Sequence, residues 1–210
     1  ISKNIYHICL FQSTFIIISF FTLIFAFIIS DFSIVTVYQN SHSLKPFFYK
    51  ISGTWGNHEG SLLLWAIILT IFSYFFLLYS KSHSKNFRIY SLVVQNILIL
   101  GFLFFLLFNS NPFSAISPVP KEGLGLNPIL QDPALAIHPP LLYIGFVGSS
   151  IYFSAAIGSL LANYDGKLFA KSIKNWVLIS WSFQTLGILT GSIWAYYELG
   201  WGGFWFWDPV

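Results

Sequence analysis

Five apolar runs of about 20 residues constrain the fold of this 210-residue chain more than any other feature. They cover residues 10–29, 62–78, 92–108, 141–161 and 176–195. As helices, such runs are long enough to cross a hydrocarbon layer of roughly 30 Å. We therefore expect an all-α fold, a polytopic transmembrane helical bundle with about five spans and long external loops. Residues 1–210 are expected to form a single membrane domain.

The charged residues are too few for most other classes of protein. They make up 8% of the chain, against roughly 25% in soluble domains. A soluble enzyme, a disordered chain and a nucleic-acid-binding protein are thereby excluded. The ten basic residues, the seven acidic residues and the five histidines all lie outside the spans or at their edges. Proton pumps and ion-coupled carriers need ionisable groups at membrane depth, so we expect any chemistry at the membrane surface.

Other compositional features bear on the origin of the chain. Cys9 is the single cysteine, so neither an internal disulfide nor a thiolate metal site is expected. The chain contains no methionine and begins at Ile1, which predicts a fragment or a processed piece of a longer protein. Phe and Ile are very frequent, which is typical of an AT-rich genome such as a mitochondrial one.

The distribution of the positive charges predicts the orientation of the chain. The short connections 81–88 and 164–174 carry three cations each, and with Lys3 one side holds seven cations. The other side holds three cations and six acids. Because short cation-rich loops stay inside, we expect the N-terminus inside and the long loops outside, together with the C-terminal segment.

The external segment 194–210 is rich in tryptophan and glycine. Tryptophan commonly forms a belt at the membrane interface. Glycines between the rings would also let a flat partner such as a porphyrin approach closely. We weigh the belt and the ligand platform about equally on these residues alone. The candidate binding residues are Trp194, Trp201, Gly202, Gly203, Trp205, Trp207 and Asp208.

A second motif is His138-Pro139-Pro140, which precedes the fourth apolar run. Proline is favourable in the first turn of a helix, and it holds the residue before it in an extended conformation. We therefore expect His138 immediately before a helix, on the outer face. It is either an interfacial histidine bonded to a loop carbonyl or an axial ligand of haem iron.

A third motif, Trp55-Gly-Asn-His58-Glu59-Gly-Ser61, leads into the second apolar run. It reads as a turn in which Asn57 or Ser61 caps the following helix. His58 and Glu59 could transfer protons or bind a polar ligand edge, but together they cannot complete a metal site. We favour a docking or structural role for Trp55, His58 and Glu59.

Four blocks in this order resemble the CcmF family of cytochrome c-type biogenesis proteins, the haem lyase component. They are Trp55–Ser61, the run from Gln131 to Tyr143 with its His138-Pro-Pro, Ala195–Gly200, and Trp-Gly-Gly-Phe-Trp-Phe-Trp-Asp-Pro-Val at 201–210. The resemblance extends from about Phe25 to Val210. Phe204 and Phe206 stand where the family often has Trp, which keeps the aromatic character.

The resemblance implies a role in cytochrome c maturation. Haem b would be held as the substrate on the external tryptophan-rich surface, with His138 as an axial ligand of the iron. The two thiols of a Cys-x-x-Cys-His segment of apocytochrome c then form thioethers with the haem. The implied partners are apocytochrome c, a haem chaperone, other maturation proteins and the lipid bilayer. Nucleic acid is not among them.

The resemblance also implies that the chain is incomplete as a haem lyase. The family's second external histidine would lie beyond Val210, and its first helix before Ile1. We therefore expect a further C-terminal haem lyase chain to complete the enzyme, and the 210 residues alone to be inactive. The composition favours the mitochondrial inner membrane, with the haem site facing the intermembrane space. A bacterial inner membrane with the site facing the periplasm is the alternative.

Other functions remain open at this stage. A haem exporter or chaperone-loading protein shares the tryptophan-rich segment, but the Trp55–Ser61 and His138 blocks argue against it. A related nitrite-reductase haem lyase is harder to separate. A non-catalytic respiratory-complex or structural subunit is the alternative from another class, and the haem spectrum of the protein would distinguish it.

Overall fold

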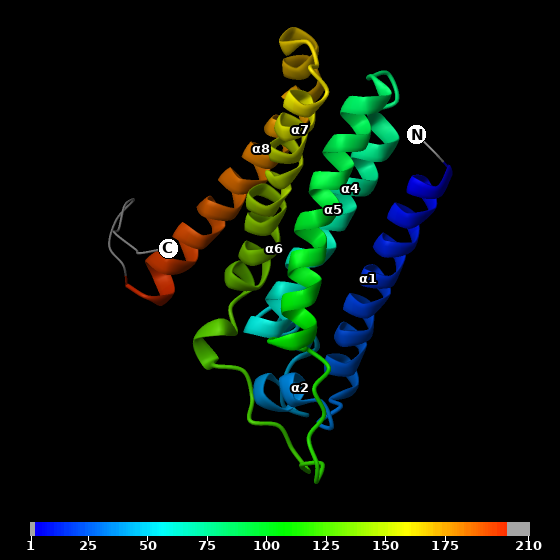
Figure 1. Cartoon of the computed structure of the whole chain (residues 1–210). Helices are drawn as coiled ribbons and strands as arrows, with labels where there is room; N and C mark the ends of the chain where they lie inside the picture. Colours follow the sequence, from blue (N-terminus) through cyan, green and yellow to red (C-terminus); the bar gives the residue numbers. More distant parts are fainter. Residues whose placement is uncertain (1–2, 201–210) are drawn as a thin grey trace.

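A computed structural model describes residues 3–200 of the chain, and this part is built from helices and loops (Figure 1). The elements in chain order are α1 (Lys3–Ile29), α2 (Val35–Asn40), α3 (Phe47–Gly53), α4 (His58–Tyr79), α5 (Lys85–Phe108), the short 3₁₀ helix η1 (Pro128–Leu130), α6 (Pro133–Gly148), α7 (Ser150–Leu161) and α8 (Gly166–Glu198).

Five segments are long and apolar enough to cross a membrane: Ile5–Ile29, His58–Tyr79, Lys85–Phe108, Pro133–Leu161 and Gly166–Glu198. The prediction of an all-helical membrane bundle with about five spans is confirmed. The helices are longer than the apolar runs, because polar capping residues start α5 and α8 several residues before the apolar runs begin. The Ser84 hydroxyl accepts from Phe87 N, and the Asp165 carboxylate accepts from Lys167 N and Leu168 N. The fourth span is divided at Ser149 into α6 and α7.

The two short cation-rich connections lie together at one end of the bundle, the end at which α1 begins (Figure 1). His83 Nδ1 in the α4–α5 connection is 2.8 Å from the Tyr164 hydroxyl in the α7–α8 connection. The rings of Phe87 and Tyr164 stack with centroids 4.4 Å apart. We call this the cationic end of the bundle.

The long connections 30–57 and 109–132 lie at the opposite end, which we call the loop end (Figure 1). Glu122 joins them, because its carboxylate accepts from Ser43 N at 2.9 Å and from the Ser43 hydroxyl at 2.5 Å. Gly123 N donates to the same carboxylate at 3.0 Å. These bonds, those from Ser43 first, lower the pKa of Glu122 to about 2. The two connections therefore form one layer over this end.

A buried amide holds three of the long helices together inside the bundle. Gln95 of α5 is fully buried, and its Nε2 donates to Leu69 O of α4 at 3.2 Å and to Ser150 Oγ of α7 at 2.9 Å. Its Oε1 accepts from Ser154 Oγ at 2.8 Å. Every polar atom of the amide group is thus bonded within the protein, as a lipid environment requires.

Close packing of α5 against α7 depends on Gly158. A Cβ atom at this position would meet the Ser91 hydroxyl and would lie 2.6 Å from Ser91 N. Gly158→Ala should therefore force the two helices apart and lower the free energy of unfolding by about 1–3 kcal/mol. Thermal unfolding in detergent micelles measures this difference.

Gly101 in α5 provides the matched control, because a Cβ there would meet nothing within 4 Å. Gly101→Ala should be neutral or stabilise the protein by up to about 1 kcal/mol, since alanine favours the helix. Equal stability of the two variants would contradict the tight α5–α7 contact.

Candidate functional site

His138 lies in the second turn of α6, so the prediction that it stands in an extended conformation before the helix is wrong. The helix begins at Pro133 because Asp132 caps it. The Asp132 Oδ1 atom accepts from Ala134 N at 2.8 Å and from Leu135 N at 3.0 Å. Pro133 at the first helical position needs no hydrogen-bond partner. The helical signal of the cap is stronger than the preference of a residue before proline.

Pro139 and Pro140 both lie inside α6. Pro140 has no N–H to give to the carbonyl of Ala136, four residues earlier. The Trp55 indole Nε1 instead donates to Ala136 O at 2.9 Å. The structure thus joins the Trp55–Ser61 block to the His138 block, which are far apart in the sequence.

The His138 imidazole is held by α8. Its Nδ1 atom is 2.6 Å from the carbonyl oxygen of Gly187. Because a carbonyl can only accept, Nδ1 carries the hydrogen and the neutral ring keeps a lone pair on Nε2. The ring lies over Gly191, where a Cβ atom would come within 2.6 Å of His138 Cε1. Two backbone features of α8 therefore set the tautomer and the orientation of the imidazole.

Small residues bring α6 and α8 close enough for this contact. A Cβ at Gly187 would lie 2.7 Å from Leu142 Cα, and one at Gly145 would meet the backbone of Gln184. Such small-residue contacts are typical of membrane helix pairs. The Tyr197 hydroxyl also donates to Asp132 Oδ2 at 2.5 Å. The loop end of α6 is thus attached to the C-terminal turns of α8.

Only part of the predicted tryptophan-rich site falls within residues 3–200. Trp194 lies in the last turns of α8, and its buried Nε1 has no hydrogen-bond partner within that part of the chain. The other predicted binding residues lie outside the described residues, and their haem-binding role stays a prediction. They are Trp201, Gly202, Gly203, Trp205, Trp207 and Asp208.

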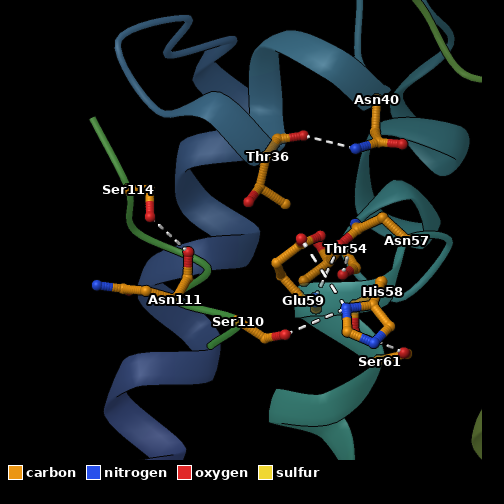
Figure 2. A network of polar contacts seen from close by, with 11 residues as sticks. Thr36, Asn40, Thr54, Asn57, His58, Glu59, Ser61, Ser110, Asn111 and Ser114 are labelled. Atoms are coloured by element: carbon orange, nitrogen blue, oxygen red, sulfur yellow. Dashed lines mark hydrogen bonds and ion pairs between the residues drawn. The ribbon is translucent and has the colours of Figure 1, made fainter. Parts of the chain in front are cut away.

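The Trp55–Ser61 block forms a capped turn at the start of α4 (Figure 2). Asn57 is the cap, since its Oδ1 accepts from Gly60 N at 2.7 Å. The His58 Nδ1 atom lies 3.3 Å from Ser110 Oγ and 3.9 Å from Glu59 Oε1. The His58 side chain is 64% exposed. Its imidazole contacts the 109–132 connection and is not paired with His138.

A pocket of about 410 Å³ lies between the two blocks, and both Trp55 and Ala136, which are bonded to each other, line it. Its walls come from Trp55, Asn57, His58 and Ser61 on one side and from Leu126, Leu130, Leu135, Ala136, Pro139 and Tyr143 on the other. His138 does not line this pocket, because its ring faces α8. The structure therefore separates His58 and His138 onto different sides of α6.

His138 is suited to act as a single donor. Within residues 3–200, no three His, Cys, Asp or Glu side chains gather closely enough to hold a metal ion. A porphyrin iron takes four ligands from the macrocycle, so a single protein donor such as a histidine can hold it. An imidazole with a free Nε2 and a bonded Nδ1–H provides such a donor.

Several residues of this site escaped the sequence analysis. Gly187 and Gly191 orient His138, and Tyr197 binds Asp132. The sequence predicts a docking or structural role for Trp55, but not its bond to the Ala136 carbonyl. Their signals are weak in one sequence. The spacing of four residues between the two glycines predicts a helix contact, and a proline inside a helix leaves the carbonyl four residues earlier without its partner. Neither signal identifies the partner.

The chain is similar to proteins of cytochrome c assembly. The family model described as "Cytochrome C assembly protein" matches residues 55–210. The cytochrome c-type biogenesis protein CycK of Rhizobium meliloti is 52% identical over 192 residues, which are 91% of this chain and 28% of that protein. NrfE of Haemophilus influenzae, also a cytochrome c-type biogenesis protein, is 45% identical over 188 residues, 90% of this chain and 30% of NrfE.

A solved structure has the same fold. The cytochrome c haem lyase CcmF superimposes with a TM-score of 0.81 at 26% identity, over 97% of this chain and 32% of that one. The chain thus spans about 30% of the length of the curated relatives that it matches.

The contact between His138 and Gly191 can be tested without any ligand. Gly191→Ala places a Cβ 2.7 Å from His138 Nδ1, so the ring should leave the Gly187 carbonyl. We expect the ¹⁵N resonances of the imidazole to report a protonated Nδ1 in the parent chain and mixed tautomers in the variant. Gly101→Ala is the control and should leave these resonances unchanged. Unaltered His138 signals in Gly191→Ala would contradict the described contact.

Proposed function

The chain belongs to the cytochrome c assembly protein family, and from this membership we propose that it holds haem for covalent attachment to apocytochrome c. The observation that carries the proposal is the hydrogen bond of 2.6 Å between His138 Nδ1 and Gly187 O. It gives an imidazole at the loop end of the bundle the tautomer and the fixed direction of an axial ligand.

The proposed substrate is haem b, with His138 Nε2 as one axial donor. Trp194 and the predicted residues Trp201, Gly202, Gly203, Trp205, Trp207 and Asp208 are proposed as the surface against which the porphyrin packs. The position of His138 supports this arrangement. It is anchored on α8, and the chain continues from the end of α8 directly into the tryptophan-rich segment.

The proposed chemistry places the reactive groups on the substrates. Each thiol of a Cys-x-x-Cys-His segment adds across a haem vinyl group, so that a C–S bond forms and the thiol proton goes to the other vinyl carbon. The protein needs no nucleophile of its own for this reaction, and Cys9 is buried within the bundle. Its residues contribute by binding and orienting the haem.

The proposed partners are apocytochrome c, a haem chaperone and other cytochrome c maturation proteins. The relatives described above are bacterial, which favours an inner membrane with the haem site facing the periplasm. The mitochondrial location depends on composition alone. Both locations place the loop end on the outer face of the membrane.

Replacement of His138 tests the ligand assignment. His138→Ala should lower haem retention by at least about tenfold. Loss of the hydrogen-bond partner of a ligating histidine already costs about 10–100-fold in metal affinity or activity, and here the ligand itself is lost. The absorption spectrum of the purified protein and the yield of mature cytochrome c measure the effect.

His83→Ala at the cationic end is the matched control, and it should keep normal haem absorbance because His83 contacts Tyr164 far from α6. Normal absorbance in the His138 variant as well would remove His138 from the proposal. A protein that inserts normally but never binds haem would instead favour the non-catalytic subunit.

The proposed orientation is tested by cysteine labelling in intact membranes. Cys9 is buried and should not react, so cysteines introduced at His83 or at Lys121 give separate signals. A membrane-impermeant maleimide added from outside should label position 121 and not position 83, because seven cations hold the cationic end inside. Labelling at position 83 with protection of position 121 would reverse the orientation.

A further inference from the structure

We propose that Trp55 is a positioning residue for His138, acting through the Ala136 carbonyl that Pro140 leaves without a backbone partner. The proposal deepens the function above, since it concerns the same imidazole. It also gives the Trp55–Ser61 block a defined role in the site.

The Ala136 carbonyl needs a partner from outside its own helix. In an uninterrupted helix it would accept from the N–H of residue 140, which proline lacks. Ala136 is only 4% exposed, so water has little access to it. The Trp55 indole supplies the missing donor at 2.9 Å. A buried carbonyl without this donor would favour a different path for the helix.

The indole is fixed before it meets α6. Its ring stacks against Phe20 of α1, with centroids 6.5 Å apart and planes inclined by 16°. The turn that carries it is closed by the Asn57 amide, which donates to Gly53 O at 2.7 Å and to Thr54 O at 3.1 Å. Trp55 therefore presents its N–H from a rigid position, as a positioning residue must.

The bond acts within two residues of His138. Tyr197 binds the Asp132 cap, Trp55 binds at Ala136, and His138 itself binds Gly187. These three attachments hold the first two turns of α6 between α8 and the turn that precedes α4. Loss of the middle one frees the turn that contains both prolines, so the imidazole should no longer stay on the Gly187 carbonyl.

The experiment is a double-mutant cycle on the full chain in membranes. Trp55→Phe keeps an aromatic ring and removes the N–H donor. Pro140→Ala restores a backbone N–H for the Ala136 carbonyl. Trp65→Phe is the matched control, because Trp65 is a half-buried indole that also packs against α6, through Tyr143 and Phe146.

Three readouts are measured for each variant. Two need no haem: the ¹⁵N resonances of the His138 ring and the hydrogen exchange of the amides in residues 136–143. The third is the amount of haem bound in titrations with ferric haem. Trp55→Phe should mix the His138 tautomers, speed amide exchange and weaken haem binding about tenfold. Trp65→Phe should leave the tautomer unchanged.

The cycle separates positioning from general damage. In the Pro140→Ala background, Trp55→Phe should change the tautomer and the exchange rates little, because the backbone bond replaces the indole. The same loss in both backgrounds, or an unchanged tautomer in Trp55→Phe, would overturn the proposal.

The two proposals fail in different ways. If His138→Ala keeps its haem, the ligand assignment fails, while the two haem-free readouts still decide the role of Trp55. If His138→Ala loses its haem and Trp55→Phe leaves all three readouts at the parent values, the ligand assignment stands and Trp55 has no positioning role.

Discussion

A protein in a bilayer must satisfy its backbone N–H and C=O groups internally, and this constraint organises the structure around α6. Two prolines inside that helix remove backbone donors at the point where it enters the membrane. The indole of Trp55, carried by the turn before α4, bonds the carbonyl that Pro140 leaves open. Because Pro140 lacks an N–H, the Ala136 carbonyl needs a donor from the neighbouring Trp55–Ser61 segment. The Trp55–Ser61 and His138-Pro-Pro motifs therefore form one unit.

The same requirement explains the contact between α6 and α8. Helix association in lipid depends on close packing and on hydrogen bonds, because the hydrophobic effect gives little net attraction there. Gly145, Gly187 and Gly191 allow the backbones to approach, and the space above Gly191 is filled by the His138 ring. A carbonyl of α8 then serves as the partner of the imidazole. The close packing of α6 against α8 and the orientation of the His138 imidazole therefore both result from the same contact between these two helices.

Features of the site that depend on neighbouring residues could be predicted from the sequence. Features that depend on residues far apart in the sequence could not. The number of spans and the capping role of Asn57 follow from local patterns, and the structure agrees with both. The extended conformation expected for His138 was also a local inference, and it is wrong. The proline preference for an extended predecessor was overcome by the Asp132 cap and by contacts from α8 and from the turn before α4. These contacts join residues 49 and 81 positions apart in the sequence.

The sequence by itself determined that the chain is a helical membrane protein, because apolar runs of this length have no other stable solution in lipid. It also identified the family, through four blocks of residues. Only the tertiary structure decided where the His138 ring points and which nitrogen carries its hydrogen. Those properties depend on a carbonyl and a glycine of α8, and backbone groups leave no distinctive pattern in a sequence until the fold brings them beside a side chain.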